Sequence, residues 1–478
     1  MTIGELQALT GDPWQLALTA LYLAGAVGVT GHALLTKADG RAAVAWLALA
    51  WLSPYIGAAV YLLLGVNRVT RKAHRLAVHP AASGGPRGSA AEPVPLEAAQ
   101  LAGVARVSER LTGRELTPGN RVQLYEQGDA ALAAMLAAIG DAEHSVALTS
   151  YLFADDASGR RVAAALTAAP RRGGAARVLI DGVGGGYLRY PMLRRLRRAG
   201  VPAASFLHSW RPWRMPFLNL RNHKKLLVAD GVLAFTGGMN ITGATMAPRP
   251  GLRDAHAAVR GPAVPQLLRA FAEDWAFTTG ERLTGPAWWR PPDTAGTTAA
   301  RAITSGPDED TGTLETVLAA AIVEARRRVR VVTPYFLPDR HLSMALSLAV
   351  LRGLRVEIVM PRRSNKRVVD WAARANLRFF TGAAGSVFLT PAPFDHAKLM
   401  TVDGTLTVLG SSNWDVRSHR LNFELDLEAH DPALTARVDA AIDARIAGAR
   451  TLTDAELAAR PRWQQLRDAA ARLFLPYL

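Results

Sequence analysis

Two segments of the chain repeat one pattern of residues, and the residue types in that pattern suit phosphoryl transfer. The first segment, HKKLLVADGVLAFTGGMN, runs from His223 to Asn240, and the second, HAKLMTVDGTLTVLGSSN, runs from His396 to Asn413. Both read His, one residue, Lys, four residues, Asp-Gly, five residues, Gly-Gly or Gly-Ser, one residue, Asn. An isolated HxK would arise by chance in a chain with 11 histidines, whereas an 18-residue repeat with identical spacing indicates a doubled functional site.

The His and the Lys of each segment are expected to act together. Each segment continues into an apolar run typical of a strand, on which residues i and i+2 point to the same face. Lysine fills both equivalent positions although the chain has only six lysines, which indicates that a compact ammonium is needed at a defined point. One imidazole, one ammonium and one amide from each half would surround a phosphoryl group. The catalytic candidates are His223, Lys225, His396 and Lys398, and the phosphate-binding candidates are Asn240 and Asn413.

Two imidazoles at one site allow a two-step transfer. One histidine can attack phosphorus while the other protonates the leaving oxygen and then acts as a base. We expect one imidazole of the free enzyme to be neutral and the other charged, which predicts a bell-shaped pH dependence of the rate. The pattern leaves open which histidine attacks.

Four acidic residues occupy matched positions in the two halves. Asp254 lies 31 residues after the first repeated histidine, and Glu424 lies 28 residues after the second. Either would be interpreted alone as a surface charge, but the matched positions favour a carboxylate that bonds to a ring nitrogen and orients the imidazole. Asp230 and Asp403 are also catalytic candidates, although each precedes a glycine in a tight turn. A structural role in holding that turn is an equally good interpretation.

The elements around these motifs alternate between strands and helices. Apolar, β-branched runs at 145–153, 176–181, 328–336 and 355–361 are typical of strands, and alanine-rich stretches with helical spacing precede two of them. This alternation predicts an α/β fold. The order of parts occurs twice, so we expect two similar α/β halves related by a pseudo-two-fold axis, with one histidine from each at their interface. The predicted ranges are 96–280 for the first half, 281–300 for the connection and 301–478 for the second half.

The N-terminal segment contains two uncharged apolar runs, at 16–35 and 42–66. At 1.5 Å per residue either run is long enough to cross a hydrocarbon core of roughly 30 Å. They predict a hairpin of two transmembrane helices within residues 1–78, in which Pro54 and Gly57 could kink the second helix. A buried helical hairpin of a soluble protein is one alternative. A signal peptide is a weaker one, because acidic rather than basic residues precede the first run.

The residues after the second run indicate an orientation. The tail carries Arg68, Arg71, Lys72 and Arg75, and a basic flank is typical of the cytoplasmic side. We therefore expect a multi-pass protein of the inner membrane, with both termini and the catalytic domain in the cytoplasm. Residues 79–95 are rich in Pro, Gly, Ala and Ser and are interpreted as a linker.

Charge and composition narrow the partner and the cofactor. The chain has 56 basic and 40 acidic residues, a net charge of +16, which favours a polyanion such as nucleic acid or anionic lipid. The apolar hairpin favours lipid and argues against nucleic acid. The chain has no cysteine, which excludes disulfides, thiolate metal sites and cysteine nucleophiles. We expect no metal and no cofactor, because each HxK places a cation beside the candidate ligand.

The doubled HxKxxxxD motif resembles the signature of the phospholipase D superfamily, and the chain more narrowly resembles bacterial cardiolipin synthases. The resemblance covers nearly the whole chain and includes YLLLGVNR, TSYLF, DGVGGG, RNHKK, TPYFLPD and SNWDVRSHRLNFE. It implies two phospholipase D-like α/β sandwich halves and a phosphohistidine intermediate. It also implies that two phosphatidylglycerol molecules are converted to cardiolipin and glycerol.

Three alternatives share parts of this pattern. A phospholipase D hydrolase, or a phosphatidyltransferase with another alcohol acceptor, would share the first half-reaction. A nuclease of the same superfamily would suit the basic charge but not the apolar hairpin. A non-enzymatic membrane scaffold is disfavoured because both motifs are complete. The oligomeric state is left open.

Overall fold

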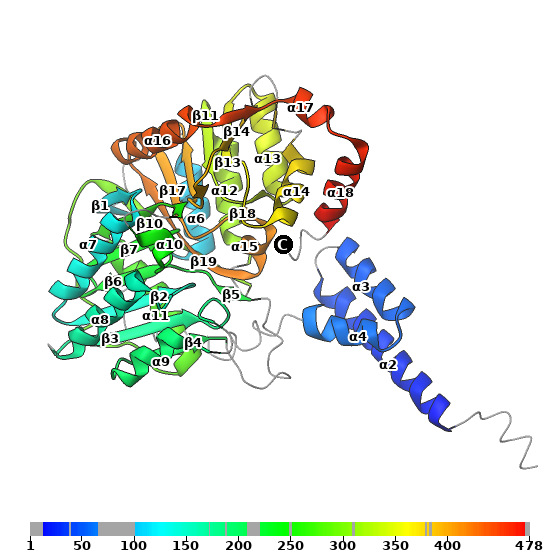
Figure 1. Ribbon diagram of the computed structural model, residues 1–478, viewed down its shortest axis with the longest axis horizontal. Helices are drawn as coiled ribbons and strands as arrows, with labels where there is room; N and C mark the ends of the chain where they lie inside the picture. The colour runs from blue at the N-terminus through cyan, green and yellow to red at the C-terminus, as the bar shows by residue number, and fades with distance from the viewer. Residues whose placement is uncertain are drawn as a thin grey trace, which may run out of the picture. The chain divides into compact units, whose positions relative to one another are not determined.

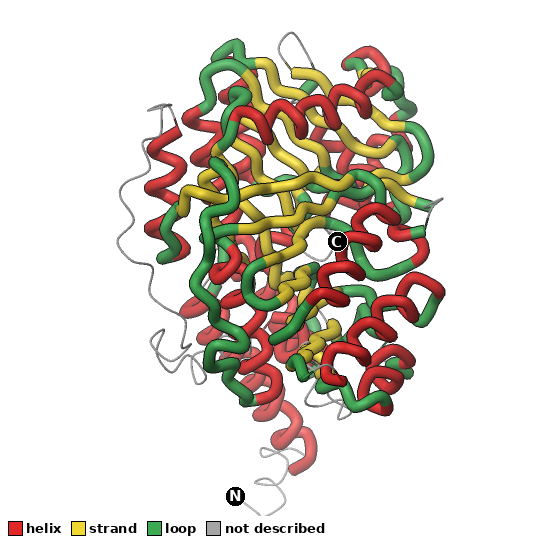
Figure 2. The backbone as a smooth tube through the Cα atoms, turned by 90° about the vertical axis from the view of Figure 1, so that its left-hand side faces the viewer, coloured by secondary structure: helices red, strands yellow, loops and turns green. Residues whose placement is uncertain are grey.

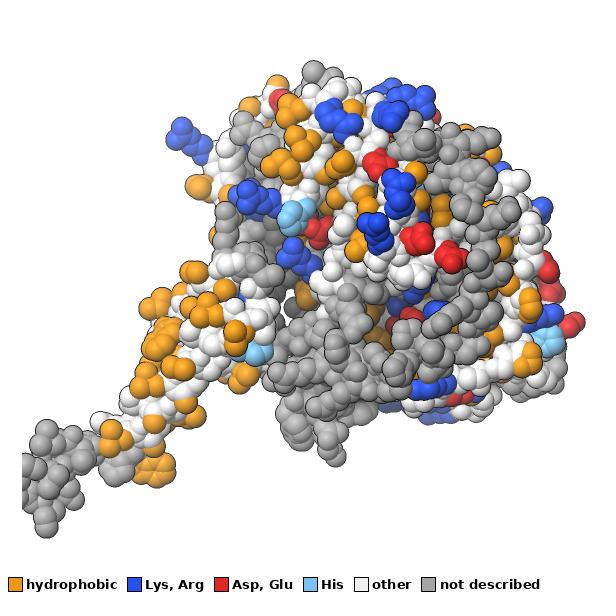
Figure 3. All heavy atoms as spheres, turned by 180° about the vertical axis from the view of Figure 1, so that it is seen from behind, with side chains coloured by type: hydrophobic (Ala, Val, Ile, Leu, Met, Phe, Trp, Pro, Cys, Tyr) orange, Lys and Arg blue, Asp and Glu red, His pale blue; other side chains and the backbone are white. Residues whose placement is uncertain are grey.

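The computed structural model describes residues 13–37, 40–65, 101–171, 173–186, 189–207, 220–247, 251–307, 311–377, 380–381 and 385–473. They form two compact units, an N-terminal helical unit up to residue 65 and a body from residue 101 onward (Figure 1). The basic tail and the predicted linker at 79–95 lie outside the described residues. In Figure 3 hydrophobic side chains cover most of the helical unit, whereas the body has a mixed surface on which Lys and Arg recur.

The helical unit contains one helix that is long and apolar enough to cross a membrane. This helix, α2 (Pro13–Thr36), has 24 residues and corresponds to the first predicted span. The second apolar run is divided into α3 (Gly40–Leu52), α4 (Ile56–Val60) and a π-helical turn, η1 (Tyr61–Gly65). The 13 residues of α3 rise about 20 Å, which is short of a hydrocarbon core of roughly 30 Å. The prediction of a continuous second span over 42–66 therefore differs from the structure.

The second run reverses direction at Ser53–Tyr55 and returns along α2. Tyr55 has a left-handed backbone, with φ of 62°, and its hydroxyl donates to the carbonyl of Leu18 at 2.9 Å. Gly57 packs so closely on α3 that a Cβ there would lie 2.1 Å from the Leu49 carbonyl oxygen. The Lys37 ammonium then donates to the carbonyl of Gly65 at 2.5 Å. The run thus begins and ends beside the same end of α2, because the proline and the glycine permit a reversal rather than a kink.

The body consists of two halves with the same order of elements. The first half contains β1 (Thr117–Tyr125), α7 (Gly128–Asp141), β2 (Ser145–Ser150), α8 (Ala157–Arg171), β3 (Ala175–Asp181), α9 (Pro191–Arg198), β4 (Ala203–Phe206), β5 (Arg221–Asn222), β6 (Leu226–Ala229), β7 (Leu233–Gly237), α10 (Gly243–Met246), β8 (Leu252–Arg253), β9 (His256–Arg260) and α11 (Val264–Thr279). The predicted strands at 145–153 and 176–181 correspond to β2 and β3.

The second half begins after the connection. It contains β10 (Thr298–Ser305), α12 (Thr313–Glu324), β11 (Arg328–Val332), β12 (Phe336–Leu337), α13 (Arg340–Leu351), β13 (Arg355–Pro361), α14 (Arg367–Asn376), β14 (Gly385–Thr390), β15 (Phe394–Asp395), β16 (Leu399–Val402), β17 (Leu406–Gly410), β18 (Trp414–Asp415), α15 (Val416–Arg420), β19 (Asn422–His430), α16 (Pro432–Ala447), β20 (Arg450–Leu452), α17 (Asp454–Ala458) and α18 (Arg462–Leu473).

A 16-stranded sheet among the described residues relates the two halves by pseudo-symmetry. Its order is β20-β14-β13-β11-β16-β17-β19-β10-β1-β9-β7-β6-β2-β3-β4, and β5 pairs with β19 off this path. Outward from the antiparallel β1–β10 pair, β9-β7-β6-β2-β3-β4 on one side matches β19-β17-β16-β11-β13-β14 on the other. In each half three parallel strands form the outer part, as expected for strands joined by helices. The strands run through the middle of the body with helices outside (Figure 2).

Each half has its own hydrophobic core. The first is built on β2, β3, α7 and α8 and includes Leu132, Val146, Leu166 and Val178. The second is built on β11, β13, α12 and α13 and includes Leu318, Val331, Leu346 and Val356. Helix α6 (Ala102–Thr112) lies within the range predicted for the first half, yet Val104 packs in the core of the second half. Helix α6 therefore packs on the second half although it precedes the first half in the sequence.

Candidate active site

The first histidine, His223, is positioned by a strand that crosses between the halves. Strand β5 pairs in parallel with the start of β19, and the backbone N–H of His223 donates to the carbonyl of Phe423 at 2.9 Å. The next residue of β19, Glu424, therefore lies beside the imidazole. Its carboxylate oxygens are 2.9 and 3.0 Å from Nδ1 of His223. Glu424 is fully buried and also accepts hydrogen bonds from Ser411 and Asn422.

The second histidine, His396, is positioned in the same way from the opposite side. Strand β15 pairs in parallel with β8, and the backbone N–H of His396 donates to the carbonyl of Arg253 at 2.7 Å. The following residue, Asp254, is buried, and its Oδ2 lies 2.8 Å from Nδ1 of His396. Gly238 leaves room for this carboxylate, because a Cβ there would lie 2.0 Å from Oδ1 of Asp254.

Each acid thus bonds to the histidine of the other half. The sequence placed Asp254 after the first motif and Glu424 after the second, but the crossed strand pairing gives Glu424 to His223 and Asp254 to His396. A carboxylate on Nδ1 fixes the tautomer that leaves Nε2 as the reactive nitrogen. Neither histidine is oriented without the other half, so the two halves make one site.

The two lysines are buried beside the histidines but are arranged differently. The Lys225 ammonium donates to the carbonyl of His223 at 2.5 Å and lies 5.6 Å from the ring centroid of Tyr151. The Lys398 ammonium contacts the carbonyl of His396 and lies 2.7 Å from Nδ1 and 3.1 Å from Nε2 of that ring. Burial lowers the pKa of Lys225 to about 7 and the pKa of Lys398 to about 8.

Both imidazoles are neutral in the free site near pH 7. Burial lowers the pKa of His223 to about 4 against the opposing effect of Glu424. Burial, reinforced by Lys398, lowers the pKa of His396 to about 4. This differs from the expectation of one charged imidazole, because burial disfavours the charged ring and the neighbouring ammonium groups oppose a further positive charge. A bound phosphodiester would add a negative charge and favour protonation of one ring.

Two tyrosines flank the histidines in matched positions. The rings of Tyr151 and His223 have centroids 5.1 Å apart, and those of Tyr335 and His396 are 6.4 Å apart. The segments TSYLF and TPYFLPD carried these residues in the sequence, but no role was assigned to them. Their matched place after β2 and β11 was the signal that could have found them. Burial raises the pKa of Tyr335 above its ordinary value, so its hydroxyl stays protonated and donates to Oδ1 of Asn365 at 2.5 Å.

The aspartates of the HxKxxxxD motifs lie at the other end of the strand from the histidines. Asp230 follows β6 and accepts hydrogen bonds from the backbone N–H groups of three successive residues, Glu143, His144 and Ser145. Asp403 follows β16 and accepts from Arg326, Arg327 and Arg328 in the same manner. Each carboxylate fixes the start of β2 or β11, the strand that leads to a flanking tyrosine. These bonds favour the structural interpretation over a direct catalytic role.

The two asparagines differ in their use. Oδ1 of Asn240 accepts the backbone N–H of Leu152 at 3.1 Å, which ties the loop after β2 to the end of the first motif. Oδ1 of Asn413 is buried and has no hydrogen-bond partner among the residues that the structure describes. The side chain of Asn413 therefore has hydrogen-bonding capacity left for a ligand.

Buried carboxylates hold the two crossing strands, and sequence reasoning missed these contacts. The carboxylate of Asp181 accepts the backbone N–H of Asn222 at 2.7 Å in β5. In the second half the guanidinium of Arg445 donates to Asp395 in β15 at 2.8 Å. Asp181 ends a strand, which was a usable signal. Arg445 lies 50 residues from its partner, and no local pattern indicates the pair.

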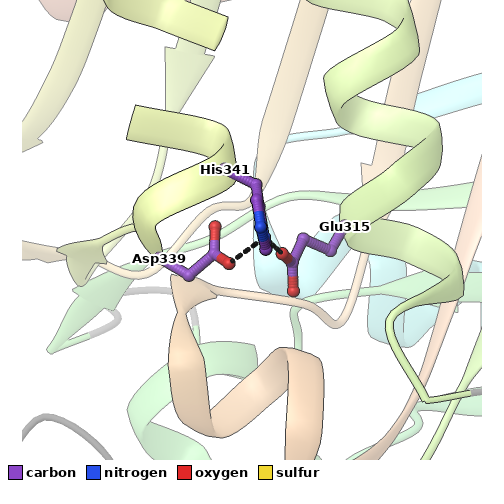
Figure 4. A group of neighbouring side chains, drawn as sticks. All are labelled: Glu315, Asp339 and His341. Atoms are coloured by element: carbon purple, nitrogen blue, oxygen red, sulfur yellow. Dashed lines mark hydrogen bonds and ion pairs between the residues drawn. The ribbon is translucent and has the colours of Figure 1, made fainter. Parts of the chain in front are cut away.

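One other cluster of titratable side chains lies apart from the motifs (Figure 4). Nδ1 of His341 is 3.1 Å from Glu315 and 3.0 Å from Asp339. Burial and the neighbouring Asp339 raise the pKa of Glu315 to about 7. Asp339 also caps α13 by accepting the backbone N–H of Leu342. These bonds account for the cluster within the protein, and we assign no ion to it.

Comparison with known proteins agrees with this geometry. The family model described as cardiolipin synthase, phospholipase D-like domain, matches residues 135–275 and 318–446, one range in each half. A cardiolipin synthase of Geobacillus kaustophilus is 31% identical over 442 residues, 89% of this chain and 87% of that protein. Cardiolipin synthase A of Pseudomonas aeruginosa is 32% identical over 476 residues, 97% of this chain and 96% of that protein.

The fold is also shared with a more distant protein. The crystal structure of a phosphatidylserine synthase from Haemophilus influenzae superposes with a TM-score of 0.61 at 15% identity, covering 78% of this chain and 100% of that one. These matches agree with the paired domains and the crossed histidine–carboxylate pairs, and together they define the family. The chain belongs to the family of cardiolipin synthases with phospholipase D-like domains.

Proposed function

We propose that the protein transfers a phosphatidyl group from one phosphatidylglycerol to the hydroxyl of another, producing cardiolipin and glycerol. The observation that carries the proposal is the pair of buried imidazoles, each oriented through Nδ1 by a carboxylate of the opposite half. Two oriented Nε2 atoms in one site supply an attacking nitrogen and a proton donor. The exchange replaces one phosphodiester by another, so no nucleotide is required.

The differing surroundings of the two lysines support an assignment of the two histidine roles. Nε2 of His223 has no hydrogen-bond partner among the described residues, whereas Nε2 of His396 lies 3.1 Å from the Lys398 ammonium. We therefore assign His223 as the nucleophile. Its Nε2 forms a bond to phosphorus as the bond to the glycerol oxygen breaks, and His396 gives that oxygen a proton. His396 then takes the proton of the second hydroxyl, which attacks phosphorus and releases His223.

The surrounding charges support an anionic substrate. The ammonium groups of Lys225 and Lys398 and the amides of Asn240 and Asn413 would hold the phosphoryl oxygens. Farther from the two histidines, burial lowers the pKa of Lys366, and the positive charges of Arg417 and Arg221 lower this pKa further. These cations lie close enough to one another to repel, and a phosphodiester would relieve that repulsion.

Hydrolysis is the alternative outcome of the same intermediate. Burial of both histidine side chains, which are 10% and 13% exposed, supports transfer to a lipid alcohol because water has limited access. The test is labelled phosphatidylglycerol in mixed micelles with excess chelator. Cardiolipin and glycerol are expected. Phosphatidic acid as the sole product would indicate a hydrolase, and an absolute metal requirement would overturn the mechanism.

We further propose that the body lies in the cytoplasm and is anchored by one crossing and one re-entrant segment. Helix α2 crosses, while α3, α4 and η1 enter and return to the Lys37 end of α2. The Tyr22 hydroxyl donates to the Trp51 carbonyl at 2.5 Å. This carbonyl near the reversal therefore has a hydrogen-bond partner, which a backbone group needs where no water is present. The basic tail after residue 66 favours the cytoplasmic side for the body. The residues before α2 then lie on the opposite side.

Single-cysteine labelling tests this arrangement, because the natural chain has no cysteine. Thr10→Cys should react with an impermeant maleimide in intact cells, and Ser83→Cys should react only after permeabilisation. If both sites became accessible only after permeabilisation, two full crossings would be indicated and the re-entrant arrangement would be wrong.

A further inference from the structure

A cavity of about 290 Å³ opens at the carboxyl ends of the parallel strands β13 and β14, outside the catalytic site. The carboxyl edge is where α/β sheets bind ligands. Three neighbouring elements, α14, β20 and α17, complete the wall. Five arginines line the cavity against two carboxylates, and they are Arg362, Arg363, Arg374, Arg450 and Arg460, with Asp370 and Glu456. The wall therefore carries an excess of positive charge.

Three of the arginines have no side-chain partner among the residues that the structure describes. Arg450 is paired with Glu456, and Arg460 with Asp468. The remaining three form neither a side-chain hydrogen bond nor an ion pair with any residue that the structure describes, and they are Arg362, Arg363 and Arg374. Burial lowers the pKa of Arg374, and the neighbouring Arg460 lowers it further. An anion in the cavity would remove this repulsion.

An apolar helix face lies next to the cavity. Helix α18 begins two residues after Arg460, and large apolar side chains on one face of it are exposed by 61%, 72% and 78%, at Trp463, Leu466 and Leu473. The guanidinium of Arg467 lies 4.5 Å from the ring centroid of Trp371 on α14 and 5.3 Å from that of Trp463. Helix α14 also carries Arg374, so α14 and α18 join the apolar face to the arginine cavity.

We propose that this surface of the second half binds an anionic phospholipid, with the phosphate in the arginine cavity and the apolar face of α18 in the bilayer interface. Unpaired guanidinium groups suit a phosphate oxygen cluster, and an amphipathic helix beside them suits the acyl boundary. Charge complementarity selects an anionic over a zwitterionic lipid. The proposal concerns binding and does not depend on turnover.

The cavity is connected to the catalytic site by a short loop. Residues 362–366 leave the cavity wall, and Asn365 accepts a hydrogen bond from the hydroxyl of Tyr335 at 2.5 Å. The Lys366 ammonium lies 5.4 Å from the centroid of the same ring, which flanks His396. A lipid held in the cavity is therefore separated by one short loop from Tyr335 and His396. Loss of the cavity should raise KM for micellar substrate several-fold while kcat changes little.

A fluorescent probe at Leu466 tests the proposal in the full chain, because Leu466→Cys provides the sole thiol. Labelled protein is placed in nanodiscs of phosphatidylglycerol or phosphatidylcholine, in which the N-terminal anchor is common to both. We expect the emission of the probe to shift to the blue in phosphatidylglycerol discs and to remain unshifted in phosphatidylcholine discs. The triple variant Arg362→Gln, Arg363→Gln, Arg374→Gln should abolish the shift. The matched control replaces three exposed arginines of the first half, Arg161, Arg194 and Arg198, and should retain it.

Two results would overturn the proposal. Identical spectra in the two lipids, obtained with the arginines intact, would show that α18 does not enter an anionic interface. Retention of the shift in the cavity variant, with an unchanged Tm, would show that α18 enters the interface independently of the arginines. Inorganic phosphate provides the third arm. If phosphate raised Tm through these arginines while phosphatidylglycerol discs gave no shift, the cavity would bind free phosphate and the lipid assignment would be wrong.

Discussion

The two halves of the active site share one topology but differ at the residues that touch the imidazoles. His223 is held by a glutamate that two further side chains fix, one of them Ser411. His396 is held by a shorter aspartate, and the position equivalent to Ser411 is Gly238. The ammonium beside His223 contacts backbone, while the one beside His396 contacts the ring itself. A duplicated frame can therefore orient two histidines equally while small changes leave their Nε2 atoms in different surroundings.

Removing the orienting charges should have the largest effect. Glu424→Gln and Asp254→Asn should each lower kcat by about 10³- to 10⁴-fold, because the imidazole loses its fixed tautomer and the support of its positive form. Steady-state kinetics with circular dichroism as a fold control provides the measurement. A normal rate of adduct formation on His223 in Glu424→Gln would contradict the pairing of Glu424 with His223.

The matched positions 238 and 411 sharpen the comparison. Gly238→Ala should lower kcat about 100-fold, because a Cβ would lie 2.0 Å from the Asp254 carboxylate and displace it from His396. Ser411→Ala should lower kcat only about 10-fold, since Glu424 keeps the bond from Asn422. Equal losses in the two variants would mean that the halves do not differ in the way proposed.

The buried lysines predict where activity is lost at high pH. Because burial lowers the pKa of Lys225 to about 7 and of Lys398 to about 8, the ammonium form is lost as pH rises through this range. Log kcat/KM should therefore fall with a slope of about one or more per pH unit above pH 7–8. Lys225→Arg should move the limb to higher pH, because a guanidinium remains charged there. An alkaline limb that stays in place in both Lys→Arg variants would assign it to another group.

The motif aspartates should show the smallest catalytic effect. Asp230→Asn and Asp403→Asn should destabilise the fold by about 1–3 kcal/mol, because a charged acceptor of three backbone N–H groups is lost. The folded-state pKa of Asp230 is lowered by these backbone bonds despite partial burial. Its contribution to stability is thus present above the unfolded pKa and is lost as pH falls through the folded value. Wild-type stability with activity reduced 1,000-fold or so would instead indicate a direct catalytic role.

Much of the site was predictable because it is repeated within the chain. The spacing of His223, Lys225 and their counterparts predicted paired side chains on strands. The structure places each Lys beside its His, but in the short links 223–225 and 396–398 between two strands rather than on a strand. The crossed acids were not predictable, because 31 and 28 residues of separation do not say which half supplies the pairing strand. Pairs distant in sequence, such as Arg445 with Asp395, leave no local pattern.

The N-terminal unit shows a second limit of sequence patterns. Length and hydropathy predict one span over residues 42–66, and these two criteria do not indicate a reversal that depends on backbone geometry. The left-handed φ of Tyr55 and the close packing of Gly57 on α3 decide that reversal. Likewise α6 joins the second core although it precedes the first half, because burial rather than chain order decides its place.

The most direct test of the account is to locate the covalent intermediate. The His396→Ala enzyme is mixed with phosphatidylglycerol labelled in its phosphate, quenched rapidly under alkaline conditions and digested. We predict slow accumulation of label on the peptide that contains His223, together with little turnover, because without His396 the leaving oxygen lacks its proton donor and the second hydroxyl lacks its base. No adduct should form in His223→Ala. Label on His396, or near-normal turnover in the His223→Ala enzyme, would contradict the assignment of different steps to the two halves.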